Sequence, residues 1–134
     1  MSTVIRTELS KKHPYWISKH RMLELKHFCL QYRDWETEYR EICVLRGHQN
    51  EFAGGGQETD RTGELATEAV ELDKKMRLVE DCCREAGDDI WEWLLKGVTE
   101  GLSFTWMEAN GIPCGRDYYY IRYRRFFWLL DKRR

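Results

Sequence analysis

The chain has 134 residues, of which 34% are charged and 13% are aromatic, and its formal net charge is −1. This length is typical of one domain and is sufficient to bury a core without a metal ion or a disulfide. The aromatic content excludes a disordered chain, and no apolar run approaches the roughly 18 residues of a membrane-spanning helix. We therefore expect a single domain over residues 1–134 that does not enter a membrane.

The charges are unevenly distributed along the chain. Residues 115–134 contain seven basic and two acidic residues, a net charge of +5. Residues 58–100 contain thirteen acidic and six basic residues, a net charge of −7. This asymmetry indicates either a polyanionic partner at the basic end or an attraction between the two segments.

The cysteines and the first residues indicate a cellular compartment. The chain contains five cysteines, an odd number. Its first 13 residues, MSTVIRTELSKKH, lack the apolar core of a secretory signal. Both features predict free thiols in a reducing cytoplasm.

The first part of the chain predicts an arm and a long helix. Residues 1–14 are polar and end at a proline, and we interpret them as a flexible arm. Apolar side chains then recur at steps of three and four residues, which predicts a helix over residues 19–45 with a bend near Tyr32. Ser18 can cap this helix. Its apolar seam consists of Leu25, Phe28, Tyr32, Trp35, Tyr39 and Ile42.

A glycine-rich segment separates this helix from a second one. Residues 47–63 contain five glycines and predict a mobile loop. A second apolar seam follows, and Gly87 is expected to end its helix. Two matched seams predict an antiparallel helical hairpin over residues 15–87, and a coiled coil between two chains is the alternative. The second seam consists of Leu65, Ala69, Leu72, Met76, Val79 and Cys83.

Residues 88–134 predict three further helices. Asp88 can cap the segment DIWEWLLKGVTE, and Ser103 can cap a short helix after it. The dipeptide Asn110-Gly111 suits a turn with a positive φ before the last, long helix. This order is that of a helix-turn-helix. The predicted fold is therefore all-α, with a helical hairpin followed by a three-helix, helix-turn-helix-like part.

The last helix carries both aromatic residues and arginines. One stripe at helical spacing is apolar and is expected to face the core: Tyr119, Tyr123, Phe126, Phe127 and Leu130. The arginines lie on other faces. They either cover the core with their apolar stems and neutralise the acidic middle of the chain, or they contact a nucleic acid.

The nucleic-acid hypothesis assigns roles along this helix. Its first turns hold the residues that would reach base edges in the major groove: Arg116, Asp117 and Tyr120. The following turns hold the residues that would contact phosphates: Arg122, Arg124 and Arg125. The end of the chain would add nonspecific attraction through Lys132, Arg133 and Arg134. The partner would be duplex DNA.

Two segments of the chain resemble known proteins. YWISKHRMLELKHFCLQY (residues 15–32) and the segment from LLKGVTEGLSF to GIPCGRDYYYIRYRRFFWLLDKRR (residues 94–134) resemble small proteins encoded by phages and prophages of Gram-positive bacteria. The tail is loosely similar to ArpU/RinA-type late transcriptional regulators, which end in a helix-turn-helix like that of sigma factors. The resemblance implies a phage-encoded DNA-binding transcriptional regulator in the bacterial cytoplasm. It places on or near DNA Arg116, Tyr120, Arg122, Arg124 and Arg125.

Two other functions stay open. A phage protein can capture a host protein, and the acidic middle of the chain could bind a basic surface such as a nucleic-acid channel. The carboxylates assigned to this role are Glu68, Glu71, Glu80 and Asp81. A packaging component such as a terminase small subunit is the third hypothesis. A ring is expected for that component, and a monomer or homodimer for a regulator.

Nothing in the sequence indicates an enzyme, a cofactor or a metal site. Asp88, Asp89 and Glu92 form a local acidic cluster, which suits the positive end of a helix dipole. The glycines at 54–56 lack the preceding strand and the following Lys-Ser/Thr of a phosphate loop. The cysteines and histidines lack the paired short spacings of a zinc site.

Overall fold

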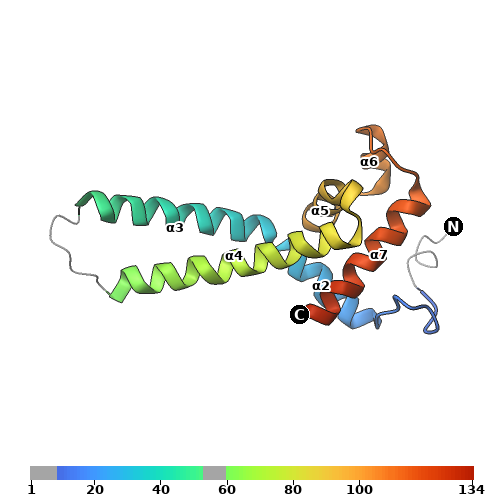
Figure 1. Cartoon of the computed structure of the whole chain (residues 1–134), viewed down its shortest axis with the longest axis horizontal. Helices are drawn as coiled ribbons and strands as arrows, with labels where there is room; N and C mark the ends of the chain where they lie inside the picture. The colour runs from blue at the N-terminus through green and yellow to red at the C-terminus, as the bar shows by residue number, and fades with distance from the viewer. Residues whose placement is uncertain (1–8, 53–59) are drawn as a thin grey trace. The chain divides into compact units, whose positions relative to one another are not determined.

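The computed structural model describes residues 9–52 and 60–134, and the ordered elements in these ranges are all helical (Figure 1). No strand occurs in either range, so the predicted all-α fold is confirmed. The elements are α2 (Lys19–Leu30), α3 (Tyr32–Phe52), α4 (Asp60–Ala86), the 3-10 turn η1 (Asp88–Ile90), α5 (Trp91–Glu100), α6 (Phe104–Ala109) and α7 (Arg116–Arg133). None of these helices combines the length and hydrophobicity that crossing a membrane requires.

The chain forms two compact units. The hairpin unit, Gln31–Arg77, contains α3 and the first part of α4. The terminal unit, Met1–Leu30 with Leu78–Arg134, contains α2, the end of α4 and the elements that follow it.

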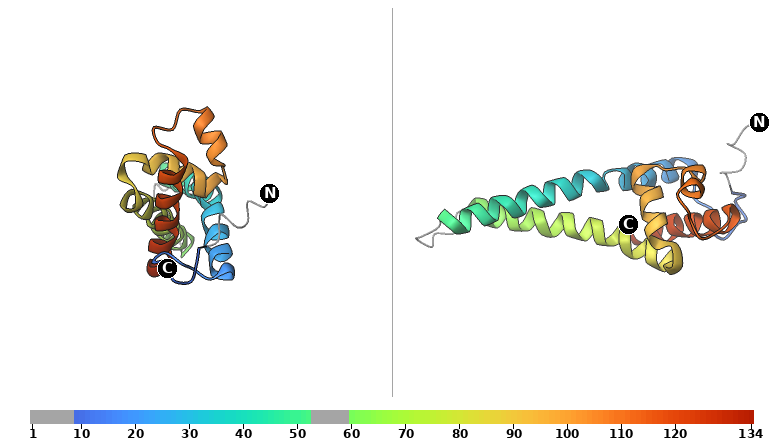
Figure 2. Two further views of the ribbon diagram at one scale, coloured as in Figure 1. Left: turned by 90° about the vertical axis from the view of Figure 1, so that its right-hand side faces the viewer. Right: turned by 90° about the horizontal axis from the view of Figure 1, so that it is seen from above.

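In the hairpin unit, α3 and the first part of α4 run antiparallel and side by side (Figures 1 and 2). Lys75 Nζ of α4 lies 5.7 Å from the ring centroid of Trp35 on α3. The buried residues of this unit belong to the two predicted seams: Tyr32, Trp35, Ile42, Ala69, Leu72 and Met76. The two seams therefore pair within one chain, as the hairpin prediction requires.

The helices of the hairpin extend further than predicted. A turn at Gln31 separates α2 from α3, next to the position of the predicted bend at Tyr32. α3 continues through Gly47 to Phe52, and α4 begins at Asp60, so the predicted loop over residues 47–63 is too long. A glycine inside a helix costs only about 1 kcal/mol relative to alanine, and the hydrogen bonds of the surrounding turns offset it. The three glycines at 54–56 and residues 1–8 of the predicted arm lie outside the described residues.

In the terminal unit, α2, α5 and α7 pack against one another. The end of α4 adds buried side chains to the same core: Val79, Cys82, Cys83 and Ala86. On α7 the predicted core residues Tyr119, Phe126, Phe127 and Leu130 are buried, and Tyr123 is partly buried. Leu129 is buried in addition.

A close approach in this core joins α7 to α5. Tyr119 is 1% exposed, and a Cβ atom at Gly97 would overlap its hydroxyl. The same Cβ would lie 3.1 Å from Met107 Cε of α6. A glycine at position 97 is therefore required for these helices to pack as they do. The Tyr119 hydroxyl is buried and has no hydrogen-bond partner in the described chain.

Replacing Gly97 by alanine should destabilise the protein, because the new methyl group overlaps the Tyr119 hydroxyl. We expect Gly97→Ala to lower the free energy of unfolding by about 1–3 kcal/mol, measured by urea denaturation. The double variant Gly97→Ala/Tyr119→Phe should recover most of this loss, since phenylalanine lacks the overlapping oxygen.

Gly47 provides the matched control for this prediction, because a Cβ there meets nothing within 4 Å. Gly47→Ala should raise stability by up to about 1 kcal/mol through helix propensity alone. Equal stability of Gly97→Ala and the unaltered protein would contradict the packing account, as would the absence of any recovery in the double variant.

Candidate nucleic-acid interface

A glycine turn connects α6 to the segment that leads into α7. Gly111 has a φ of +88°, in the left-handed region. The N–H of Gly111 donates to the Glu108 carbonyl at 3.2 Å, and the N–H of Ile112 donates to the Met107 carbonyl at 3.0 Å. These two bonds define the glycine C-cap known as the Schellman motif, and Ile112 is buried as its hydrophobic anchor. The turn predicted at Asn110-Gly111 is confirmed.

The start of α6 also follows the sequence prediction, but the connection to α7 is longer than expected. The Ser103 hydroxyl accepts a hydrogen bond from the Trp106 N–H at 3.3 Å and caps α6. The connection spans residues 110–115. A helix-turn-helix uses a turn of roughly 3–4 residues. The segment therefore has the element order of that motif without its tight turn.

The first turns of α7 present one side to solvent. Arg116 and Asp117 are exposed, and Ile121 is 52% exposed. Tyr120 and Arg124 are partly exposed. The guanidinium carbon of Arg116 lies 5.7 Å from the centroid of the Tyr120 ring. The core on the opposite side of α7 holds these residues in place.

Cationic and aromatic side chains alternate every four residues along α7. Residues four apart on a helix are neighbours on its surface. The series consists of Arg116, Tyr120, Arg124, Trp128 and Lys132. Lys132 Nζ lies 3.5 Å from the ring centroid of Trp128. Sequence reasoning did not assign a role to Trp128, although the spacing of four residues could have found it.

Arg122 has an internal role. Its stem packs on Gly87, where a Cβ would lie 3.3 Å from Arg122 Cγ, and its Nη1 donates to the Ala86 carbonyl at 3.5 Å. The guanidinium carbon lies 4.8 Å from the ring centroid of Tyr118, whose hydroxyl donates to Asp89 at 2.7 Å. Arg122 therefore joins α7 to the C-terminal end of α4.

Two sequence predictions concern this junction. The predicted end of the helix at Gly87 is confirmed, because α4 ends at Ala86, and Gly87 itself has an extended φ of −168°. A side chain at position 87 would require the Arg122 stem to shift slightly. Asp88 does not cap α5; it begins the 3-10 turn η1, which has no side-chain cap, and Asp89 binds Tyr118 instead.

The last two arginines are also bound within the terminal unit. Arg133 donates to Glu85, and this hydrogen bond raises the pKa of its guanidinium. Arg134 Nη1 donates to Glu24 at 2.8 Å, and its guanidinium carbon lies 4.2 Å from the Phe28 ring centroid. These contacts hold the end of α7 against α4 and α2, so both side chains contribute to the fold.

The carboxylates assigned to protein binding are divided between the two units. Glu68 and Glu71 lie on α4 in the hairpin unit, whereas Glu80 and Asp81 lie in the terminal unit. Glu71 pairs with Lys74 at 3.3 Å, and both side chains are exposed. Glu68 and Asp81 are exposed as well. No single unit contains all four predicted residues.

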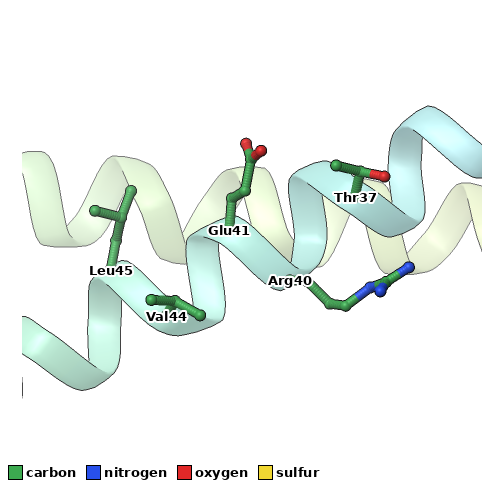
Figure 3. A pocket seen from close by; sticks show the side chains of 5 residues that line it. All are labelled: Thr37, Arg40, Glu41, Val44 and Leu45. Carbon is green, nitrogen blue, oxygen red and sulfur yellow. The ribbon is translucent and has the colours of Figure 1, made fainter.

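A surface hollow of about 490 Å³ lies along α3 (Figure 3). Its lining consists of Thr37, Arg40, Glu41, Val44 and Leu45. The Thr37 hydroxyl donates to the Arg33 carbonyl at 3.0 Å, within the same helix. The lining is thus one amphipathic side of a helix, and no residue predicted to bind nucleic acid contributes to it.

Three thiols are buried in the core of the terminal unit. Burial raises the pKa of Cys29 to about 12 and that of Cys82 to about 11, and it raises the pKa of Cys83 as well. Cys43 is exposed and Cys114 is partly exposed. Across residues 9–52 and 60–134, no group of histidines, cysteines and carboxylates is arranged to hold a metal ion.

The buried thiols should be protected from reagents and should make stability depend on pH. At about pH 8, a thiol reagent should modify Cys43 rapidly and the buried thiols only after unfolding. The folded-state pKa of the Cys29 and Cys82 thiols lies above their ordinary value of 9.0. Both thiols therefore stabilise the native state at pH values below 9.0. The free energy of unfolding should therefore fall as the pH rises from 9.0 towards the folded values of about 11 and 12.

Burial also raises the pKa of Tyr119 and Tyr123. Both tyrosines therefore add to the loss of stability at alkaline pH. In the Cys43→Ser variant, only the slower reaction of Cys114 should remain in the native protein. Rapid modification of several thiols in that folded variant would contradict the burial of Cys29, Cys82 and Cys83.

Comparison with models of protein families, with curated proteins and with solved structures gives no significant match to this chain. The structure itself divides the residues predicted to contact nucleic acid. It brings Arg116, Asp117, Tyr120 and Arg124 together on the first half of α7. Arg125 is partly buried, and its Nε has no hydrogen-bond partner within the described chain. Arg122, Arg133 and Arg134 bind other parts of the terminal unit.

Proposed function

We propose that this protein is a DNA-binding transcriptional regulator that contacts duplex DNA with the first half of α7. One observation carries the proposal. The buried side of α7 is fixed by the core through Tyr119, and the other side carries the exposed Arg116 and Asp117 and the partly exposed Tyr120. The resemblance of residues 94–134 to small phage proteins, and the loose similarity of the tail to late transcriptional regulators of phages, support the same function and a phage origin.

The exposed residues suit the major groove chemically. Arg116 is the first residue of α7, and a guanidinium can donate two hydrogen bonds to the O6 and N7 atoms of guanine. Asp117 can accept a hydrogen bond from the N4 amino group of cytosine. The Tyr120 ring beneath Arg116 limits the conformations of that guanidinium, which favours a defined contact. The positive end of the helix dipole adds attraction for phosphates.

Phosphate contacts are assigned to fewer residues than the sequence predicted. Arg122, Arg133 and Arg134 bind within the terminal unit, and a phosphate contact would have to break these interactions. The phosphate contacts that we retain are those of the partly exposed Arg124 and Arg125 and of the exposed Lys132. The electrostatic contribution to DNA binding should be correspondingly smaller than the charge of +5 over residues 115–134 indicates.

The double variant Arg116→Gln/Arg124→Gln tests this proposal. Its affinity for a labelled duplex should fall at least about tenfold, since each lost contact is worth about 1–3 kcal/mol. The slope of log affinity against log salt should become shallower by about 2, because two phosphate or base contacts are lost. Fluorescence anisotropy at several salt concentrations measures both quantities.

The control variant Arg40→Gln/Lys74→Gln removes the same positive charge from exposed residues of the hairpin unit. It should bind DNA like the unaltered protein. An equal loss in both variants would show that only net charge matters, which would reject the assigned interface. Absence of DNA binding by the unaltered protein at low salt would reject the function itself. Thermal unfolding confirms that each variant is folded.

A second candidate function, capture of a host protein, is favoured by the acidic side of α4 in the hairpin unit. Glu64, Glu68 and Glu71 are exposed and lie at i, i+4 and i+7, so they form one stripe. Val70 beside this stripe is 52% exposed. Carboxylates next to an apolar side chain suit a basic protein surface.

The triple variant Glu64→Lys/Glu68→Lys/Glu71→Lys tests this second function. A host protein that binds the stripe should be retained by the unaltered chain in affinity capture and lost by the triple variant. The variant Arg116→Gln/Arg124→Gln should retain it. A partner that survives the charge reversal would show that the stripe is not the binding surface.

A further inference from the structure

The two longest stretches of the chain without an acidic residue are residues 9–23 and residues 118–130. The first contains three lysines, one arginine and two histidines. Although more than 90 residues separate them in sequence, the structure places them side by side in the terminal unit. Figure 2 shows the beginning of the described chain beside the second half of α7.

The segment before α2 has a defined conformation. The N–H of His13 donates to the Ser10 carbonyl at 2.8 Å, and the N–H of Trp16 donates to the His13 carbonyl at 3.0 Å. The N–H of Tyr15 also donates to His13 Nδ1 at 3.0 Å. These bonds form two consecutive turns, and Pro14 restricts the backbone between them. Residues 9–18 therefore form a folded arm, whose turns carry Lys11 and Lys12.

Tyr15 attaches this folded arm to α7. Its ring centroid lies 5.3 Å from that of Trp128, with a tilted geometry that suits an aromatic pair. Trp128 also contacts Lys132, whose Nζ lies 3.5 Å from the ring centroid. Just beyond the arm, Arg21 Nε donates to Asp131 at 2.7 Å. The arm and the start of α2 are thus held against the last turns of α7.

The lysines of the arm differ from the basic residues that stabilise the fold. Lys11, Lys12 and Lys19 are exposed, and within residues 9–52 and 60–134 none of them has an acidic partner. Arg21 and Arg134, in contrast, each pair with a carboxylate. An exposed ammonium group without a partner is available for a phosphate, and its compact charge suits phosphate better than a base edge.

We propose that the folded arm is a second DNA contact, in which Lys11 and Lys12 bind the sugar–phosphate backbone beside the segment that α7 reads. The proposal rests on the proposed DNA-binding function and deepens it. Trp128 follows Arg116 by twelve residues, a distance of about 18 Å along a helix. The arm is therefore far enough from the first turns of α7 to meet phosphates that these turns do not reach.

The variant Lys11→Gln/Lys12→Gln tests the contribution of the charges. Its affinity for duplex DNA should fall about three- to tenfold at low salt, by a similar factor for different DNA sequences, and its salt slope should become shallower by about 2. The charge-matched control Arg40→Gln/Lys74→Gln should bind like the unaltered protein. A duplex shortened on the flanking side should abolish the difference between the lysine variant and the unaltered protein.

The variants of Tyr15 test the attachment of the arm. Tyr15→Ala keeps every charge but removes the ring that contacts Trp128, and its affinity should fall by a factor similar to that of the lysine variant. Tyr15→Phe keeps the ring and should bind like the unaltered protein. Because these changes lie outside the helices, circular dichroism should show unaltered helix content.

The outcomes separate this inference from the function on which it rests. If the unaltered protein does not bind duplex DNA, both are rejected. If Arg116→Gln/Arg124→Gln loses binding but Lys11→Gln/Lys12→Gln does not, the arm contact alone is rejected. If the lysine variant loses affinity but Tyr15→Ala does not, the lysines act without attachment to α7 and the proposal is rejected. The proposal would also be rejected if the protein bound single-stranded RNA more tightly than duplex DNA and the lysine variant lost RNA affinity by the same factor.

Discussion

The packing of Tyr119 against Gly97 is the constraint on which the terminal unit depends. The ring occupies the space of a missing side chain on α5, and it also contacts Phe104 of α6 at a centroid distance of 5.6 Å. Three helices meet at this point. A helix fixed along one side has no freedom to rotate about its axis, so the residues on its other side are fixed as well. The burial of Tyr119 therefore sets the positions of the exposed Arg116 and the partly exposed Tyr120.

The basic residues of the terminal unit divide into two groups with different physical roles. One group binds carboxylates or carbonyls of neighbouring helices, as Arg122 does at the end of α4 and Arg133 does with Glu85. These side chains pack their apolar stems and satisfy helix ends, which stabilises the fold. The other group, exemplified by Arg116 and Lys11, is exposed and has no acidic partner in the described chain. Net charge counts both groups equally, whereas a polyanion can bind only the second without disrupting the fold.

Aromatic rings organise the second group. Tyr120 lies beneath Arg116, and Trp128 lies beneath Lys132 while it also holds Tyr15. Such rings restrict flexible cationic side chains, which lowers the entropy lost when a ligand binds. At both ends of α7, a half-buried aromatic ring thus restricts a cationic side chain beside a proposed DNA contact. The hairpin unit has a different surface, with carboxylates along α4, and this difference favours a separate role for it.

The features that depend on local forces could be predicted from the sequence. Apolar spacing predicted the helical seams and the buried stripe of α7, because each helix must bury one side. Ser103 and Gly111 predicted the cap of α6 and its turn, because a hydroxyl cap and a left-handed residue act over a few residues. The limits of the loop after Gly47 were missed, since a helix tolerates a single glycine when its neighbours continue the hydrogen-bonding pattern.

Which basic residues are available to a partner depends on how the helices pack, and this could not be predicted from the sequence. Arg122 binds Ala86 across 36 residues of sequence, and Arg134 binds Glu24 across 110. The attachment of Tyr15 to Trp128 is equally remote. No local pattern encodes such pairs, because a guanidinium has the same chemistry whether it lies beside a carboxylate or faces water. The sequence therefore specified the helices and the positions of the charges, and the packing of the helices determined which charges stabilise the fold and which remain exposed.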